Sequence, residues 1–401
     1  MKILYHHRVG SKDGQLVHIE EIVRALRALG HDVVVVGPAA MKKTKFGADS
    51  GLVQHLKDRL RPSFYELLEF AYGIIAFVRL WFAYRREGPD IIYERYNLYL
   101  LAGSWLKRLT GIPLLLEVNA PLVAERSQFD KLANKRLAQW AERSVWRSAS
   151  YVLPVTRVLA KEVERAQVYP PRIVVVQNGV APEFLHGAID GTRVRKRFGL
   201  TDCLVLGFTG FIREWHGLER VIDFIARKDS GDRLRAFFVG EGPAVAELQH
   251  RAAAQGVGDR VVFAGLVPRE EIIDHIAAFD VAMQPHVVPY ASPLKLFEYM
   301  ALRRAIVAPS TANIQEVLTD GEDALLFDRN DPAAFDAALE RVCGDVALRE
   351  RLGRAARATL ERKGFTWADN ARRIVALAEE ALAVGRQPGL PGPKVAKWWG
   401  R

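Results

Sequence analysis

The sequence predicts an α/β protein built from two doubly wound, Rossmann-like domains, each with a parallel β-sheet. Short apolar runs alternate with amphipathic helical segments along most of the chain, which is typical of parallel sheets covered by helices. The alternation ends near Asn178 and starts again near Leu204. The length of 401 residues also exceeds what one hydrophobic core usually organises. We therefore expect two such domains that face each other across a cleft.

In the first half, short apolar runs bounded by Gly, Pro, Asn or Asp predict the strands. They cover residues 2–6, 32–36, 90–93, 113–118, 151–155 and 173–176. Helical periodicity predicts helices over residues 15–29, 98–109, 131–147 and 157–166. Thr156 is expected to cap the last of them. Each helix connects two strands, as the parallel fold requires.

The same pattern restarts in the second half. Strands are expected over residues 204–209, 234–239, 261–264, 280–285, 305–309 and 324–327. Helices are expected over residues 218–226, 244–255, 270–278, 293–301, 332–342 and 367–384. Residues 386–401 are rich in Pro, Gly and Lys and are expected to form a mobile basic tail.

Composition narrows the possible partners and the compartment. The formal net charge is +10 and the pI about 9.6, which favours anionic substrates, membrane surfaces or nucleic acid. No nucleic-acid motif is present and the basic residues are dispersed, so we expect no nucleic-acid partner. Cys203 and Cys343 are the only cysteines, which disfavours disulfides and structural zinc and fits a reducing compartment. The chain begins with a strand and shows no signal-peptide pattern, so a cytoplasmic location is expected.

Residues 64–84 form the most membrane-like segment. Glu66, Glu69 and Arg79 interrupt it, whereas a membrane span needs about 18 uncharged residues. Arginines flank or follow its apolar run, namely Arg59, Arg61, Arg79, Arg85 and Arg86. One interpretation is a helix that lies on an anionic bilayer surface, which would make the protein peripheral at the inner face of a membrane. The other is an ordinary domain helix with solvated arginines.

The segment around residues 292–301 is the strongest candidate binding site. Ser292 is a good N-cap and Pro293 suits the first helical position, so a helix should begin just after a buried strand. Helix N-termini attract anions, and Lys295 adds a positive charge in the first turn. Glu298 shares a face with Lys295. A phosphate beside the lysine and a ribose beside the glutamate would satisfy both, whereas a plain Lys–Glu pair on a core helix is the alternative.

Two glycine loops follow the first two strands of the second half. Residues 210–217 have a glycine at each end and contain Arg213 and His216, which could add positive charge. Gly240-Glu241-Gly242 follows the next strand. Glycines let backbone amides approach a ligand closely, although plain turns would also explain both loops.

The first half offers three further candidates at strand ends. His7 follows the first strand, Gly14 precedes the first helix, and Asn119 follows the strand that ends at Val118. In open parallel sheets, ligands bind at the carboxyl ends of strands, so these positions can face a ligand. A structural role is the alternative for His7.

Several common motifs are missing from the chain. No Asp-x-Asp pair is present, which removes the usual way of holding a divalent ion beside a sugar nucleotide. A bound diphosphate would then be neutralised by cationic side chains and helix ends. There is no Walker loop, and no Gly-x-Gly-x-x-Gly follows the first strand, so phosphoryl transfer and dinucleotide redox chemistry are not expected.

Taken together, these motifs resemble those of the family 4 (group 1) retaining glycosyltransferases, which have the GT-B fold. The resemblance covers nearly the whole chain. It rests on residues 176–180, 210–217, 239–243, 262–265, 292–301, 316–327 and 365–384. It implies an N-terminal acceptor-side domain over residues 1–180 and a C-terminal nucleotide-sugar-binding domain over residues 181–365. It also implies that a helix over residues 366–385 packs back on the first domain.

The resemblance implies transfer of a sugar from a UDP- or GDP-sugar to a lipid-linked or polysaccharide acceptor, without a metal or another cofactor. The catalytic residues would be Lys295, Glu298, Arg213, His216 and Asn119. The donor-binding residues would be Gly14, Gly210, Gly240, Glu241, Gly242, Ser292, Pro293 and Leu294. His7 would contact the transferred sugar or the acceptor.

Some positions depart from the family pattern. Two family glutamates usually stand seven residues apart; Glu298 matches the second, but Ala291 occupies the first. The family's basic pair is replaced by Phe211 and His216, and many members have a histidine where Asn119 stands. Two alternatives remain open: a sugar-nucleotide epimerase of the same fold, which needs acid–base carboxylates, and a non-catalytic sugar-nucleotide-binding module.

Overall fold

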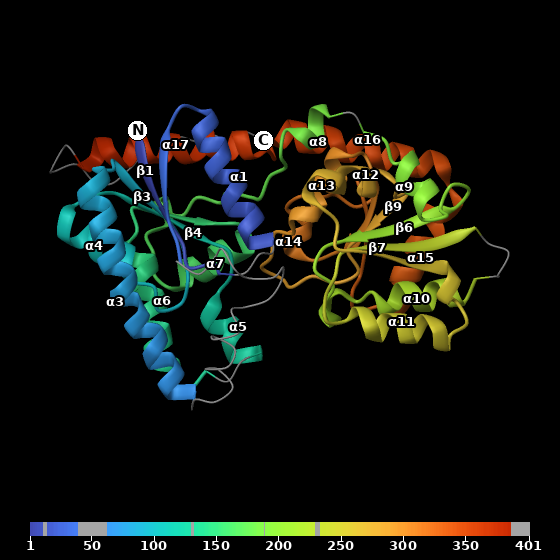
Figure 1. The fold of residues 1–401 in the computed structure, drawn as a ribbon, viewed down its shortest axis with the longest axis horizontal. Coiled ribbons are helices and arrows are strands. Elements are labelled where there is room, and N and C mark those ends of the chain that lie inside the picture. Colours follow the sequence, from blue (N-terminus) through green and yellow to red (C-terminus); the bar gives the residue numbers. More distant parts are fainter. Residues whose placement is uncertain (11–13, 39–61, 130–131, 188, 229–232, 386–401) are drawn as a thin grey trace. The chain divides into compact units, whose positions relative to one another are not determined.

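The computed structural model describes residues 1–10, 14–38, 62–129, 132–187, 189–228 and 233–385. They form two compact units, each with its own parallel sheet (Figure 1). Among the described residues, the first unit comprises those within 1–177, 290–292 and 367–385, and the second those within 178–289 and 293–366. The expected basic tail at residues 386–401 lies outside the described part of the chain.

The first unit contains a five-stranded parallel sheet with the order β2-β1-β3-β4-β5. Its strands are β1 (Lys2–His6), β2 (Asp32–Val36), β3 (Ile91–Arg95), β4 (Leu114–Val118) and β5 (Tyr151–Pro154). Strands β3, β4 and β5 are buried along their whole length, as expected when helices cover both faces of a parallel sheet. Chain order reverses at β1 and β3, so their carboxyl ends form a topological switch point.

Helices cover this sheet, and the last of them comes from the C-terminus. They are α1 (Gly14–Ala28), α3 (Pro62–Glu87), α4 (Ala102–Thr110), α5 (Leu122–Phe129), α6 (Lys135–Ser148), α7 (Arg157–Arg165) and α17 (Trp367–Gly385). The side chains of Asn134 and Thr156 cap α6 and α7. α17 packs against α1 (Figure 1), and Trp367 meets His18 edge to face, with ring centroids 4.8 Å apart. The C-terminal helix therefore returns to the first unit.

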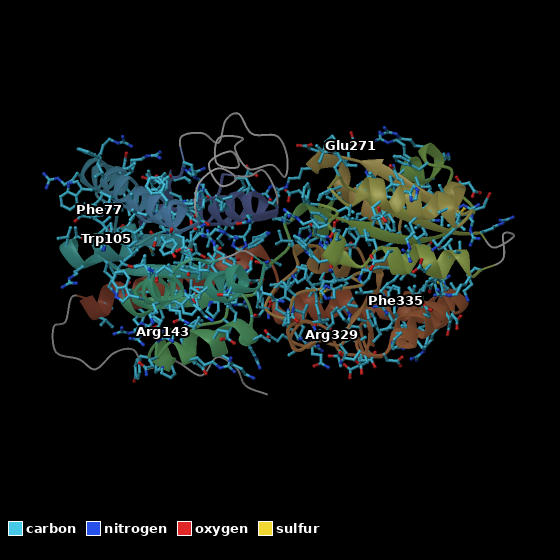
Figure 2. All side chains as sticks on the ribbon, turned by 90° about the horizontal axis from the view of Figure 1, so that it is seen from below. Phe77, Trp105, Arg143, Glu271, Arg329 and Phe335 are labelled. Carbon is cyan, nitrogen blue, oxygen red and sulfur yellow. The ribbon has the colours of Figure 1, made fainter. Side chains whose placement is uncertain are left out.

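Helix α3 is attached to the first unit by one face. Phe77 of α3 meets Trp105 of α4 edge to face, with ring centroids 5.8 Å apart (Figure 2). The carboxylate of Glu66 accepts hydrogen bonds from the backbone N–H groups of Ala133 and Asn134 at 2.6 and 3.0 Å. Glu66, which interrupts the apolar sequence of α3, is thus buried and binds the helix to the rest of the first unit.

Glu69 provides the second anchor. It forms a bidentate pair with Arg126, at 2.6 and 3.0 Å, and also contacts Arg8 at 3.3 Å. The opposite face of α3 is exposed and apolar over most of its length, and its side chains are Phe64, Leu67, Leu68, Ile74, Ile75, Val78 and Phe82. By length and composition, residues 63–87 could cross a membrane, although Glu66 and Glu69 hold the other face within the unit.

The second unit contains a six-stranded parallel sheet with the order β11-β10-β9-β6-β7-β8. Its strands are β6 (Leu204–Thr209), β7 (Leu234–Val239), β8 (Val261–Gly265), β9 (Val281–Met283), β10 (Ala305–Pro309) and β11 (Leu325–Phe327). When the six strands are numbered 1 to 6 in chain order within this unit and read from the β8 edge, their order is 3-2-1-4-5-6, which is the Rossmann order. The switch point lies between β6 and β9, because chain order reverses there.

The helices of the second unit are short near the switch point and long at the C-terminal end. They are α8 (Glu183–His186), α9 (Thr192–Arg197), α10 (Glu219–Ala226), α11 (Val245–Ala254), α12 (Ile272–Ala277), α13 (Leu294–Ala301), α14 (Ala312–Gln315), α15 (Pro332–Gly344) and α16 (Val346–Lys363). Phe335 of α15, labelled in Figure 2, packs on Phe327 of β11, with ring centroids 5.1 Å apart. A core of Leu, Ile, Val and Phe side chains joins these helices to the sheet.

The structure differs from the sequence-based expectation at a few elements. The segment expected as a strand over residues 173–176 lies along β5 but forms only an isolated bridge, between Ile173 and Val152, rather than a regular ladder. The backbone N–H groups of Val174 and Val176 still donate to carbonyl groups of β5, each at 3.0 Å. The helix expected from residue 98 begins at Ala102, since Tyr99 adopts a left-handed backbone (φ 63°) that a helix cannot contain. Helix α5 was not expected, and its sequence has no clear apolar stripe.

Candidate functional site

The candidate site of the second unit lies at its topological switch point. Strand β6 ends at Thr209 and β9 at Met283, and the two strands are neighbours in the sheet. The N-terminal end of α13 follows β9 after a short connection. In doubly wound sheets this is where ligands bind, because the loops of adjacent strands diverge there. The sequence motifs around Gly210, His216 and Lys295 come together at this place.

The two glycine loops pack directly against each other. Ile212 donates its backbone N–H to the carbonyl of Glu241 at 2.8 Å. A Cβ atom at position 240 would lie 2.1 Å from the carbonyl oxygen of Gly210, and one at position 242 would lie 2.0 Å from that of Ile212. Gly210 and Gly240 also have positive φ values of 133° and 134°. Glycine is therefore required at these positions by the close backbone approach, while the Glu241 side chain itself is exposed.

Arg213 is held by aromatic side chains of its own loop. Its guanidinium lies 4.7 Å from the ring centroid of Phe211 and 4.8 Å from that of Trp215. Stacking on aromatic rings leaves the edge of a guanidinium open for bidentate hydrogen bonds to an anion. Trp215 is 52% exposed, so this stack stands at the surface of the second unit.

His216 is neutral near physiological pH. Burial, followed by the positive charges of Lys295 and Arg213, lowers the pKa of His216 to about 2. Its Nδ1 accepts a hydrogen bond from the backbone N–H of Arg213 at 3.1 Å, which leaves the proton on Nε2. The sequence suggested a positive charge here, whereas the geometry makes His216 a neutral hydrogen-bond donor.

Lys295 lies over the end of β6. Its Nζ is 3.9 Å from the ring centroid of Phe208, and a Cβ at position 210 would lie 3.1 Å from it. The His216 ring contacts the same phenylalanine, with centroids 5.0 Å apart. Burial lowers the pKa of Lys295 to about 7, against the opposing influence of Glu298. Within the described residues, the ammonium has no carboxylate within 4.0 Å, and a bound anion would raise its pKa.

Glu298 is one turn further along α13. Within the part of the chain that the structure describes, its carboxylate makes no hydrogen bond and no ion pair shorter than 4.0 Å, so it is not paired with Lys295. Burial raises the pKa of Glu298 to about 7, while Lys295 and Arg269 act in the opposite direction. The simple Lys–Glu pair that the sequence left open is therefore absent from the described residues, and both groups are available to a ligand.

The start of α13 differs from the expectation. Ser292 does not cap the helix: its hydroxyl donates to Oε1 of Gln177 at 3.2 Å, and Ser292 belongs to the first unit. Pro293 occupies the N-cap position rather than the first helical one, with φ −69° and ψ 120°, and the helix begins at Leu294. Proline has no side-chain acceptor, so the first N–H groups of α13 lack a side-chain cap. The N–H of Leu296 donates to the Pro293 carbonyl at 3.2 Å, so the N–H groups of Leu294 and Lys295 are the candidate donors for an anion.

In the first unit, Asn119 stands beside a buried carboxylate at the end of β4. Its Nδ2 donates to Oε1 of Glu117 at 2.6 Å. Glu117 also accepts hydrogen bonds from the Tyr93 hydroxyl and from Nε2 of His18, and it forms an ion pair with Arg95. Asn119 is partly exposed, whereas Glu117 is only 2% exposed.

The other two candidates of the first unit are placed differently. His7 is buried: its Nδ1 accepts the N–H of Val9 at 3.2 Å, and its ring fills the space beside Gly37. Burial, together with the charges of His6 and Arg95, lowers the pKa of His7 to about 4. Gly14 is the exposed first residue of α1. His7 therefore offers little surface to a ligand, while Gly14 is the first residue of α1 rather than part of the loop before it.

Sequence reasoning missed several residues that shape the site. Phe208 supplies the surface under Lys295 and His216, and His286, after β9, lies close enough to lower the pKa of His216. Tyr299 of α13 accepts the backbone N–H of Thr209 with its hydroxyl at 2.9 Å, which ties the helix to β6. Apolar or aromatic residues of a core strand carry no sequence signal for such roles. Among the described residues, no three His, Cys, Asp or Glu side chains form a metal-binding group.

Two parallel α/β domains, with Lys295 and Glu298 at the switch point of the second, correspond to the GT-B fold. Residues 13–179 match the family described as "Glycosyl transferase 4-like domain", and residues 203–345 match "Glycosyl transferases group 1". The chain therefore belongs to the group 1 glycosyltransferases of GT-B fold, and it is a glycosyltransferase.

Individual relatives agree with this assignment. The chain is 30% identical to a D-inositol 3-phosphate glycosyltransferase of Geodermatophilus obscurus, over 77% of this chain and 71% of that enzyme. It is 26% identical to an alpha-D-kanosaminyltransferase of Streptomyces kanamyceticus, but that match spans only 62% of this chain and 65% of the relative. The solved structure of Anabaena HepE in complex with UDP has a TM-score of 0.72 at 18% identity. It covers 94% of this chain and 100% of HepE.

The charges of Lys295 and Glu298 predict a bell-shaped pH dependence of kcat/KM with a maximum near pH 7. If Lys295 holds a diphosphate, it must be protonated, so activity would fall as pH rises through its pKa of about 7. If Glu298 accepts hydrogen bonds from the substrate as a carboxylate, activity would fall as pH drops through its pKa of about 7. A sugar nucleotide is the appropriate substrate, since its diphosphate does not titrate in this range. The Glu298→Gln variant should lose the acidic limb and keep the basic one; an unchanged profile would contradict the assignment of the acidic limb to Glu298.

Proposed function

We propose that this protein is a retaining glycosyltransferase that moves a sugar from a UDP- or GDP-sugar to a lipid-linked or polysaccharide acceptor without a metal ion. The observation that supports this most is that Lys295 and Glu298, one turn apart at the start of α13, form no ion pair with any residue that the structure describes. A diphosphate matches the helix N-terminus and Lys295, and the adjoining ribose hydroxyls match the carboxylate of Glu298. That HepE was solved in complex with UDP supports this choice of donor.

The chemistry follows from where charge develops. When the bond between the anomeric carbon and the diphosphate breaks, negative charge grows on the departing phosphate oxygens. Lys295, Arg213 and the Nε2–H of His216 are donors of the second unit that would stabilise this charge. With retention, the acceptor oxygen attacks from the face that the diphosphate leaves, and its proton passes to a phosphate oxygen. No protein base is required in this scheme, which is compatible with alanine at position 291.

The donor is best identified by a thermal-shift screen of UDP-, GDP-, ADP- and dTDP-sugars, because a ligand that binds the folded state raises the apparent stability by mass action. Stabilising donors are then incubated with acceptors, and the product anomer is determined by NMR. Transfer with retained configuration supports the proposal. Inverted product would contradict retention, epimerised donor would favour the epimerase, and binding without turnover of any acceptor would favour a non-catalytic module.

Metal independence is a separate expectation. The cationic and helical donors around Lys295 can neutralise the diphosphate, and the chain has no Asp-x-Asp pair. Activity in excess EDTA should therefore stay within about twofold of the untreated enzyme. If a metal ion took part, its removal would cost several kcal/mol of charge stabilisation and the activity would fall much further. A complete loss that manganese or magnesium restores would show that a divalent ion takes part.

The acceptor proposal rests on α3. Its exposed face carries seven large apolar side chains in helical spacing, from Phe64 to Phe82, and no charged side chain of that face interrupts them. Arg85 and Arg86 follow at the exposed C-terminal end. Such a face fits the boundary between headgroups and acyl chains of an anionic bilayer. Since Glu66 and Glu69 hold the opposite face, we propose that α3 lies in the membrane surface rather than across it, at the cytoplasmic side. Arg59 and Arg61 lie outside the described residues.

Co-sedimentation with vesicles tests this surface. The full-length protein should bind phosphatidylglycerol vesicles more strongly than phosphatidylcholine vesicles, and about 0.5 M salt should weaken binding because surface charges are screened. Ile75→Glu should weaken it roughly 10- to 100-fold through the lost burial of one large apolar side chain. Val346→Glu, at an equally exposed apolar position on α16, is the matched control and should bind normally. Equal binding by Ile75→Glu would show that this face does not meet the membrane.

A soluble acceptor is the second candidate. The Geodermatophilus relative is named for an inositol phosphate acceptor, which is a small cyclic polyol. Transfer to soluble cyclitols in the absence of lipid, with no transfer to lipid-linked sugars, would favour it over the membrane acceptor.

A further inference from the structure

We propose that Glu117 is a positioning residue that turns the amide of Asn119 so that its carbonyl oxygen accepts a hydrogen bond from a hydroxyl of the sugar substrate. This inference rests on the proposed function and deepens it, because it assigns the chemistry by which the end of β4 recognises a sugar. Glu117 itself would not touch the substrate, since it is buried behind Asn119.

The carboxylate of Glu117 is saturated with donors. Oε2 accepts from Nε2 of His18 at 2.9 Å and from the Tyr93 hydroxyl at 2.8 Å. Oε1 accepts from Arg95 and, at 2.6 Å, from Nδ2 of Asn119. A buried ion costs free energy unless it is paired and fully hydrogen-bonded, and here both conditions are met. Glu117 is therefore a fixed acceptor, and the groups around it have little freedom to turn.

The fixed carboxylate decides how the Asn119 amide faces. An amide that donates through Nδ2 to a carboxylate must point its Oδ1 in another direction, and the reverse orientation would set two acceptors against each other. Among the described residues, the Asn119 side chain has no other hydrogen bond, and it is partly exposed. At the carboxyl end of β4, where ligands of parallel sheets bind, Asn119 therefore presents an acceptor suited to a hydroxyl group.

Glu117 stays ionised near neutral pH, and this keeps the Asn119 amide in the orientation described above. Burial alone would raise its pKa, but His18, Arg95 and the hydrogen bonds of His18 and Asn119 hold the pKa of Glu117 well below its ordinary range. His18 is in turn held by Trp367 of α17. The C-terminal helix α17 therefore stabilises the hydrogen-bond network of Glu117 through the contact between Trp367 and His18.

Asn119→Asp tests the arrangement through pH. The introduced carboxylate, when ionised, would be repelled by Glu117, so its pKa should be raised, and only its protonated form could donate to Glu117 as asparagine does. The other titratable or charged groups near Glu117 are Tyr5, His7, His18, Tyr93 and Arg95. We expect the variant to be roughly 10- to 100-fold less active than the wild type at pH 8. The ratio of variant to wild-type kcat/KM should then rise as pH falls through the raised pKa.

The second variant separates positioning from a merely structural role. When Asn119→Asp is combined with Glu117→Gln, the repulsion is removed, so the pH dependence of the ratio should disappear. The pKa of the introduced carboxyl group, followed by 13C NMR, should return towards about 3.9. A ratio that does not vary with pH in Asn119→Asp overturns the proposal, even if the double variant does not fold. A pH dependence that survives Glu117→Gln overturns it as well.

The NMR titration also separates this inference from the proposed function. If the wild-type protein transfers no sugar but the carboxyl group introduced by Asn119→Asp shows a raised pKa that depends on Glu117, then the geometry holds and the assignment of a retaining transferase fails. If transfer is observed and the pKa of the introduced group is ordinary, then the transferase stands and the positioning role of Glu117 is refuted.

Discussion

Replacing Lys295 by alanine is expected to lower turnover by roughly 10²–10³-fold, the usual loss when a donor to a developing oxyanion is removed. The ammonium lies at the end of β6 and has no counter-ion within 4.0 Å among the described residues, so its charge would be free to act on a departing diphosphate. His216 cannot replace it, because it is neutral and contributes only a hydrogen bond. Single-turnover rates at saturating donor isolate this effect from donor binding.

Lys196→Ala is the matched control for this experiment. Lys196 is an exposed lysine of α9 in the same unit, and its removal changes the net charge by the same amount. It should leave the rate unchanged. If Lys295→Ala turned over donor within about threefold of the wild type, Lys295 would not face the leaving group.

Glu298→Gln should weaken donor binding by about 1–3 kcal/mol, because the substitution keeps the shape but removes the charged acceptor for the ribose hydroxyls. The loss should be the same for the free nucleoside diphosphate and for the sugar nucleotide, since the ribose is common to both. It should be large at pH 8 and small at pH 6, because the carboxyl group has a pKa of about 7. Isothermal titration at both pH values measures the effect.

Glu247→Gln, at an exposed position of α11, is the control that should bind both ligands normally. An equal loss at the two pH values would point to a structural effect of the substitution. Intact affinity of Glu298→Gln for both ligands would place the ribose elsewhere.

Much of the fold could be predicted because it depends on local patterns. Strands such as Leu204–Thr209 and Ala305–Pro309 are continuous apolar runs between turn residues, and the structure confirms their bounds. The structure also confirms the cap at Thr156. An N-cap could be predicted because it depends only on residues close to it in the sequence. The strand expected over residues 173–176 failed, because a strand requires a continuous ladder with a neighbour, which the sequence does not show.

The candidate site was predicted less completely. Lys295 and Glu298 could be found because a charge inside an apolar helix is a strong local signal. The N-cap role of Ser292 was wrong because Gln177, far away in sequence, accepts its hydroxyl. The neutrality of His216 depends on burial and on the charges of Lys295 and Arg213, and the role of Glu117 depends on donors from three separate elements. Such features arise from tertiary contacts and have no pattern in the sequence.

A crystal structure of the protein with a bound UDP- or GDP-sugar would show whether the start of α13 is the donor site. We predict that the diphosphate lies within hydrogen-bond distance of Lys295 Nζ and of the first N–H groups of α13, and that the ribose hydroxyls contact the carboxylate of Glu298. Arg213 and Nε2 of His216 should lie on the same side of the diphosphate. A nucleotide bound elsewhere, without contact to Lys295 and Glu298, would refute the assignment of these two residues to the donor site.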